Sequence, residues 1–154
     1  MRLHGTLDQI LRQLTGADPE IARAANGKPF LASAPHVKFN LSHSHEMGLL
    51  VVALDVEVGA DVERIRPLSD YRAIAARFFP PSEAAALGDE RDFFRRWTRI
   101  EAILKAQGVG LYGAGMELEP GWDTVEIDAG GDYAAAAAWK REGLFQIVYE
   151  DYRA

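Results

Sequence analysis

The longest regular pattern in this sequence predicts a helix from Glu90 to Gln107. Apolar side chains recur there at the three- and four-residue spacing that places them on one face of a helix. Two glycines, Gly108 and Gly110, follow directly and are typical of a helix end. A helix with such a face has to be covered by other elements, so the rest of the chain must form around it. Its buried side is expected to consist of Phe93, Phe94, Trp97, Ile100, Ile103 and Leu104.

Short apolar runs on both sides of this helix predict strands, because turn residues bound each of them. Before the helix, three such runs are joined by tight connections, which favours an antiparallel sheet. After the helix, the alanine run at 134–138 is expected to be a strand, since turns bracket it closely. Helices and antiparallel strands together indicate the α+β class. The six expected strands span 37–41, 48–54, 58–63, 122–127, 133–139 and 144–149.

Shorter segments predict four further helices from their apolar spacing and from capping residues at their starts. Proline in the first turn supports the second of them. The expected ranges and caps are 6–14 with Thr6, 18–25 with Asp18, 69–78, and a short helix after Pro80 with Ser82 or its neighbour.

Composition excludes several classes of function. With 154 residues, the chain is long enough for one core or for two small subdomains that share one. It has no cysteine, which excludes disulfides and thiolate chemistry. Its net charge of −6 argues against general nucleic-acid binding, which relies on a surplus of Lys and Arg. No signal peptide and no membrane-length apolar run is evident, so a cytoplasmic protein without a membrane partner is expected.

Two carboxylates in an apolar setting, Asp61 and Glu63, are the first candidates for chemistry. They are two residues apart in an expected strand, so their side chains share one face, roughly 6–7 Å apart along the backbone. Such neighbours repel each other unless a proton or a cation lies between them. Mg²⁺ suits oxygen ligands of this kind and keeps positions open for water and phosphate. The alternative is a strand end whose acids point into water.

Three other groups are weaker candidates on their own. Glu101 and Lys105 are four residues apart on the expected long helix, where they form either part of a site or a surface ion pair. Ser42 and His43 follow a strand and offer a hydroxyl and an imidazole to a phosphate, unless they belong to an ordinary polar turn. Lys28 lies between turn formers, which by itself indicates little.

Taken together, the segments of this chain resemble the Sfp-type 4'-phosphopantetheinyl transferases in order, spacing and residue type. The resemblance covers about residues 26–115. Members of that family transfer the phosphopantetheine arm of coenzyme A to a serine of an acyl or peptidyl carrier protein and release 3',5'-ADP. Their fold has two similar α+β halves with the site between them. The matching segments are Gly27-Lys28-Pro29, Phe39-Asn40-Leu41-Ser42-His43-Ser44, Gly59-Ala60-Asp61-Val62-Glu63, Arg77-Phe78-Phe79, Trp97 to Ala106, and Gly108-Val109-Gly110-Leu111.

The resemblance implies a role for each candidate residue. Asp61, Glu63 and Glu101 would hold the Mg²⁺ that bridges the pyrophosphate, and Glu101 would also be a candidate base for the carrier serine. Lys105 would neutralise the charge that develops on the pyrophosphate as 3',5'-ADP leaves. The implied contacts to the phosphates of coenzyme A are Lys28, Ser42 and His43.

The resemblance also implies one domain over residues 1–154, with approximate halves 1–66 and 67–154 and small antiparallel sheets packed against helices. The first half is shorter than in the family, which allows for an oligomer that completes it. Family members usually carry Lys immediately before the helix glutamate, where this chain has Ile100. The expected function is a transferase of the holo-[acyl-carrier-protein] synthase type; the alternative is a relative that binds coenzyme A or a carrier protein without catalysis.

Overall fold

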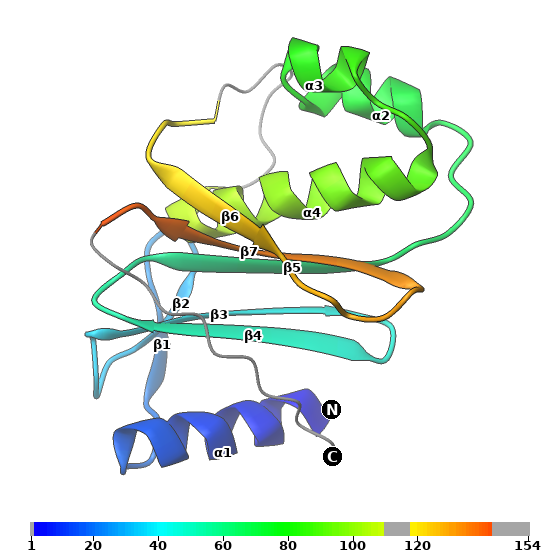
Figure 1. Cartoon of the computed structure of the whole chain (residues 1–154). Coiled ribbons are helices and arrows are strands. Elements are labelled where there is room, and N and C mark those ends of the chain that lie inside the picture. Colours follow the sequence, from blue (N-terminus) through cyan, green and yellow to red (C-terminus); the bar gives the residue numbers. More distant parts are fainter. Residues whose placement is uncertain (1, 110–117, 143–154) are drawn as a thin grey trace.

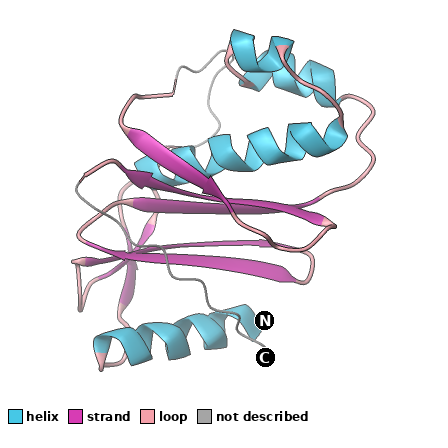
Figure 2. Cartoon of the chain, viewed as in Figure 1, coloured by secondary structure: helices cyan, strands magenta, loops and turns pink. Residues whose placement is uncertain are grey.

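The computed structural model of the chain describes residues 2–109 and 118–142 (Figure 1). The expected strand at 144–149 and the predicted helix-ending Gly110 lie outside the described residues. Figure 2 shows the strands in the middle of the molecule, with helices on both sides of them. The helices are α1 (Arg2–Thr15), α2 (Tyr71–Phe78), α3 (Pro81–Ala85) and α4 (Glu90–Gln107). The strands are β1 (Ile21–Arg23), β2 (Pro29–Leu31), β3 (Val37–Ser44), β4 (Met47–Leu54), β5 (Val58–Arg64), β6 (Trp122–Glu126) and β7 (Tyr133–Lys140).

The elements are stacked in layers (Figure 1). A three-stranded antiparallel sheet in the order β5-β7-β6 lies against α4, and α2 and α3 lie beyond that helix. On the other side of this sheet are the antiparallel hairpin β3–β4 and then α1. Strands β1 and β2 form a small hairpin of their own. None of the described helices is both long and apolar enough to cross a membrane.

Small residues allow α4 to lie very close to the sheet. Ala102 and Ala106 of the helix pack in one cluster with Ala136 and Ala138 of β7. On β5, a Cβ atom at Gly59 would lie 1.9 Å from the carbonyl oxygen of Ala102, far inside any real atomic contact. Packing therefore requires glycine at this position. The close approach brings the strand that carries the two carboxylates directly against the helix that carries Glu101.

Aromatic rings fix the N-terminal part of α4. Phe93 stacks on Phe79 and on Trp97, with ring centroids 5.4 and 5.6 Å apart. Such pairs stabilise a core beyond the area that they bury. Ile100 belongs to the same cluster and is 3% exposed. The position at which the family usually carries Lys is therefore a core position in this chain.

A second core lies between α1 and the β3–β4 hairpin. Leu7 and Leu11 of α1 are buried against Leu31, Val37 and Phe39. Because side chains alternate along a strand, the odd-numbered residues of β3 face this core and the even-numbered residues face the other way. This alternation decides where the polar end of β3 points.

Several predictions from the sequence are confirmed. The long helix has the predicted bounds, Asp89 caps it by accepting a hydrogen bond from the amide of Asp92, and Gly108 ends it in the left-handed conformation at φ 73°. The alanine run is a strand, as predicted, and the expected strands before and after the long helix lie where the apolar runs are, apart from the one outside the described residues. The class is α+β, with small antiparallel sheets against helices.

The helix predicted over 18–25 is wrong: its centre is strand β1, which pairs with β2. Gly27, at φ 84°, closes the hairpin, and the amide of Ala24 donates to the carbonyl of Lys28. Asp18, the expected cap, instead forms an ion pair with Arg12. Cross-strand pairing thus outweighs a local capping signal that is only a few residues long.

Three further expectations fail. The predicted sheet of three consecutive strands does not form, because β5 pairs with β7 rather than with β4. The predicted caps are also wrong, since α1 begins before Thr6 and Pro80 precedes α3 in place of Ser82. Strand β3 extends to Ser44, so the polar residues Ser42 and His43 lie within the strand rather than in a turn after it.

Candidate active site

The carboxylate of Asp61 lies at the junction of three elements. It is on β5, on the face of the sheet that α4 covers, and the residue is only 4% exposed. Its Oδ1 accepts hydrogen bonds from Lys105 Nζ of α4 at 2.6 Å and from Ser42 Oγ of β3 at 3.1 Å. Its Oδ2 is buried and has no hydrogen-bond partner among the described residues. A cation or a hydrogen-bond donor would stabilise an unpaired carboxylate oxygen in such a place.

Glu101 lies one helical turn before Lys105 and faces the same junction. Burial disfavours its charged form, and the nearby charges of Asp61 and Glu63 add to this effect, so the pKa of the Glu101 carboxyl is raised to about 7. The positive charge of Lys105 lowers the pKa of Glu101, but not enough to cancel the effects of burial and of the two carboxylates. A carboxyl that changes charge near neutral pH, beside two other carboxylates, has the properties of a general base.

The three carboxylates Asp61, Glu63 and Glu101 fit a hard divalent cation in their chemistry. Their oxygens are the ligands that Mg²⁺ prefers, and both the orphaned Oδ2 and the raised pKa of Glu101 would be relieved by a positive ion. Across residues 2–109 and 118–142, however, no three acidic or histidine side chains are already close enough together to hold a metal. In the structure, the positive charge beside Asp61 is Lys105. A cation would therefore have to share or take the place of that ammonium group.

Ser42 and His43 point to opposite sides of β3. Ser42 is 6% exposed and contacts Asp61 and Lys105, at 3.1 and 3.2 Å. His43, the next residue along the strand, is exposed on the other face. The structure therefore brings Ser42 together with the carboxylates and keeps His43 apart from them.

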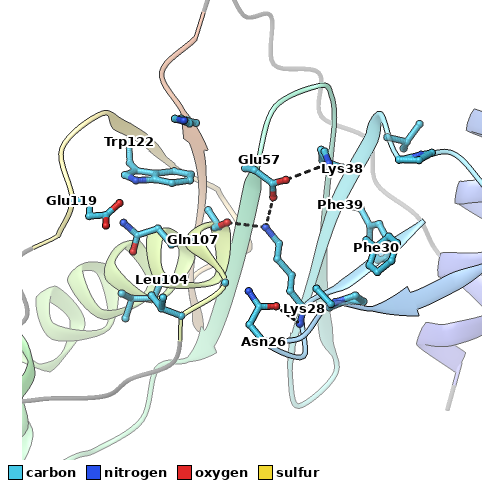
Figure 3. A pocket seen from close by; sticks show the side chains of 18 residues that line it. Asn26, Lys28, Phe30, Lys38, Phe39, Glu57, Leu104, Gln107, Glu119 and Trp122 are labelled. Carbon is cyan, nitrogen blue, oxygen red and sulfur yellow. Dashed lines mark hydrogen bonds and ion pairs between the residues drawn. The ribbon is translucent and has the colours of Figure 1, made fainter. Parts of the chain in front are cut away.

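Lys28 is held away from the carboxylates, at the edge of a large cavity of about 1080 Å³ (Figure 3). Its Nζ donates to Glu57 Oε2 at 2.6 Å and to the carbonyl oxygen of Ala106 at 2.8 Å, near the end of α4. Lys38 approaches the same carboxylate at 3.3 Å. Burial would raise the pKa of Glu57, but the hydrogen bonds and charges of the two lysines outweigh it and lower that pKa. Figure 3 shows Phe30 and Phe39 on the side of Lys28, with Trp122 across the cavity.

Three residues of this region were missed by sequence reasoning. Glu57 lies in the connection between β4 and β5 and was not a candidate, although it forms ion pairs with two lysines. Asn40 and Ser44, like Ser42, donate to or accept from β5 through their side chains. Their spacing of two along β3 was a signal that could have shown that all of them share one face.

Comparisons with known proteins show which family this chain resembles. The family model described as the 4'-phosphopantetheinyl transferase superfamily matches residues 57–153. The 4'-phosphopantetheinyl transferase HetI of Nostoc sp. is 33% identical over 159 residues, which cover 87% of this chain and 67% of HetI. For the 4'-phosphopantetheinyl transferase AcpT of Salmonella typhi the identity is 38% over 117 residues, covering 72% of this chain and 56% of the relative.

A third relative, the 4'-phosphopantetheinyl transferase ffp of Bacillus subtilis, is 34% identical over 106 residues, which cover 64% of this chain and 46% of ffp. The chain thus spans roughly half to two thirds of the length of these relatives. The family model covers more than half of the chain, and its match begins at Glu57, just before the carboxylate strand. On these matches, the chain belongs to the 4'-phosphopantetheinyl transferase superfamily.

Proposed function

We propose that this protein transfers the 4'-phosphopantetheine group from coenzyme A to a serine of an acyl or peptidyl carrier protein, in a Mg²⁺-dependent reaction that releases 3',5'-ADP. The single observation that carries the proposal is the convergence of Asp61, Glu101 and Lys105, from two elements far apart in the sequence, at one buried junction. Transfer between oxygen atoms of this kind needs positioning and charge neutralisation rather than a covalent intermediate.

In this reaction the serine oxygen of the carrier protein forms a bond to phosphorus, and the bond between that phosphorus and the bridging oxygen of the pyrophosphate breaks. Glu101, which lies beside Asp61 at this junction, is the candidate base that takes the serine proton. Lys105 turns from Asp61 toward the leaving phosphate and stabilises its negative charge. Asp61, Glu63 and Glu101 would hold the Mg²⁺, which when bound supplies further charge neutralisation at the pyrophosphate.

We place the nucleotide part of coenzyme A in the cavity beside Lys28. Its walls combine aromatic and apolar side chains with three lysines, which suits a flat base that carries phosphates: Phe30, Phe39, Trp122, Lys28, Lys38 and Lys140. Lys28, Ser42 and His43 remain the proposed phosphate contacts. Lys28 would have to exchange its bond to Glu57 for one to phosphate. Binding of coenzyme A should change the fluorescence of Trp122, and the variant Trp122→Phe should lose this change. A full signal in that variant would move the nucleotide elsewhere.

Further proposals concern the organisation of the chain. Each part contains a helix and, later in the chain, an antiparallel strand pair, α1 with β3–β4 and α4 with β6–β7; in the first part the β1–β2 hairpin lies between them. This arrangement supports our proposal of two duplicated halves, 1–66 and 67–154, of one domain. We propose that the first half is shortened relative to the family and that the protein is cytoplasmic. An oligomer that completes this half remains a prediction.

The decisive experiment measures the intact mass of an apo carrier protein after incubation with this protein, coenzyme A and Mg²⁺. One phosphopantetheine group should be added on serine, and chelation of the metal should prevent it. Unmodified mass across several carrier proteins would contradict the proposal. If the protein still bound coenzyme A in that case, it would be a binding protein of the same family, without catalysis.

A further inference from the structure

The carboxylate of Glu57 lies between two ammonium groups on the wall of the cavity. Lys28 Nζ donates to its Oε2 at 2.6 Å, and Lys38 Nζ lies 3.3 Å from its Oε1 (Figure 3). Lys28 precedes β2 and Lys38 is on β3, so two separate elements bring these cations together. All three side chains line the cavity. Two cations that converge in this way form a site for negatively charged oxygen atoms, and the carboxylate of Glu57 fills that site.

The backbone fixes Glu57 beside the lysines. Its carbonyl oxygen accepts a hydrogen bond from the amide of Lys140 at 3.1 Å, which continues the pairing of β5 with β7 by one residue. Burial opposes the charge of Glu57, but the hydrogen bond and the charge of Lys28 outweigh it and lower the pKa of the carboxyl. Glu57 is therefore ionised at neutral pH. A ligand that enters the cavity meets a fixed negative charge next to the two positive ones.

Lys28 has a second partner that holds it in place without Glu57. Its Nζ also donates to the carbonyl oxygen of Ala106 at 2.8 Å, and its side chain is only 15% exposed. An ammonium group has three N–H bonds, and described residues accept two of those of Lys28. A phosphate can bind the third or displace the carboxylate. The first route brings like charges close together and the second breaks an ion pair, so Glu57 opposes both.

We propose that Glu57 is a built-in competitor of anionic ligands: its carboxylate lowers the affinity of the two lysines for phosphate groups. This inference rests on the proposed function, in which those phosphate groups belong to coenzyme A. The substrate and the released 3',5'-ADP both carry phosphates, so Glu57 weakens the binding of both. It thus favours release of the product while it weakens capture of the substrate.

The variant Glu57→Gln tests the competition, because glutamine keeps the shape of the side chain and an oxygen that accepts from Lys28, and loses the charge. In calorimetric titrations with a chelator present, this variant should bind coenzyme A and 3',5'-ADP about three- to tenfold more tightly than the parent does. The gain should shrink at high salt, which screens charges. Parental or weaker binding in folded Glu57→Gln would overturn the inference.

The matched control for net charge is Glu126→Gln. Glu126 forms an ion pair with Arg95 and does not line this cavity, so its neutralisation removes one negative charge elsewhere. Both affinities should stay parental in this variant. A gain as large as that of Glu57→Gln would mean that only the total charge of the protein matters, which contradicts competition at the lysines.

A double-mutant cycle shows whether Glu57 acts through Lys28. In the background of Lys28→Met, Glu57→Gln should raise the affinity for coenzyme A less than it does in the parent, since one of the two cations is gone. An equal gain in both backgrounds contradicts competition at Lys28. In steady-state kinetics, Glu57→Gln should lower KM for coenzyme A without raising kcat, because contacts at the cavity wall stabilise substrate and transition state alike. A raised kcat would place Glu57 in the chemical step and overturn its role as a competitor.

The two proposals fail in different ways. A parent that binds coenzyme A but modifies no carrier protein contradicts the transferase, and tighter binding by Glu57→Gln would still support the competition. A parent that modifies carrier proteins, together with a Glu57→Gln variant of parental affinity, contradicts the competition and leaves the transferase intact. If the parent does not bind coenzyme A, inorganic pyrophosphate becomes the probe, in an NMR titration of the amides that line the cavity. Tighter binding of pyrophosphate by Glu57→Gln than by the parent would then support the competition, and equal or absent binding would contradict it.

Discussion

Replacing Gly59 by alanine should separate the two elements that build the site. The added Cβ would lie 1.9 Å from the carbonyl oxygen of Ala102 and 2.5 Å from the amide nitrogen of Ala106, both backbone atoms that cannot rotate away. An ordinary contact starts at 3.4 Å, so α4 and β5 would have to move apart by about 1.5 Å. Overpacking usually costs 1–3 kcal/mol, and at a backbone clash we expect about 3 kcal/mol or more.

The same displacement should reduce activity beyond the loss of stability, because Asp61 lies on the strand and Glu101 on the helix. A misplacement of about 1 Å between reacting groups can cost roughly 100-fold in rate. Urea unfolding gives the change in stability, and transfer rates should be compared at a temperature at which the variant is fully folded. Gly131→Ala is the matched control, since nothing lies within 4 Å of its Cβ position. Parental stability and rate in Gly59→Ala would refute the close packing of β5 on α4.

Three other substitutions test the electrostatics of the site and of the cavity. Because the pKa of Glu101 is raised from 4.5 to about 7, its contribution to stability is present below pH 4.5 and is lost as the pH rises through 7. That difference in pKa corresponds to about 3.4 kcal/mol for a fully buried group, and solvent screening lowers it to about 1–2 kcal/mol. In urea unfolding at pH 8 with chelator, Glu101→Gln should therefore be more stable than the parent by about 1–2 kcal/mol. At pH 4 the two proteins should be equally stable. Asp61→Asn should lower the transfer rate at least about 100-fold, while its far-UV circular dichroism spectrum stays like that of the parent. A near-parental rate would mean that the ion pair of Asp61 with Lys105 is only structural. Lys28→Met removes a cation that lowers the pKa of Glu57, so its cost in stability should be largest at neutral pH and should shrink as the pH falls and that carboxyl becomes protonated. A cost that does not change with pH would contradict the ion pair.

The parts of this structure that are local in sequence could be predicted from it. The long helix carries its own cap at Asp89 and its own ending at Gly108, so both bounds follow from nearby residues. The pairing of β5 with β7 could not be predicted in this way, because it joins segments on either side of the long helix and depends on packing against that helix. The hairpin of β1 and β2 was missed for a similar reason: its partner strand outweighs the capping signal of Asp18.

In the candidate site, too, some features follow from nearby residues and others depend on tertiary structure. The pairing of Glu101 with Lys105 on one helical face, and of Asp61 with Glu63 on one strand, follows from spacing alone. Spacing gives no information on which helix meets which strand, and the resemblance to a family supplied that link. The contacts of Lys28 with Glu57 and with the end of α4 depend on tertiary structure, so its place beside a cavity could only be seen in the fold.

The pairing of β5 with β7 also has a consequence for how the protein folds while the ribosome synthesises it. Residue 64, at the end of β5, precedes residue 133, at the start of β7, by about 70 residues, which take roughly 4–14 s to synthesise at 5–20 residues per second. During that time the carboxylate strand has left the ribosome without its partner. Contacts so distant in sequence also slow folding, because a long loop has to close before they form. The sheet that carries Asp61 is therefore completed only late in synthesis, when β7 pairs with β5.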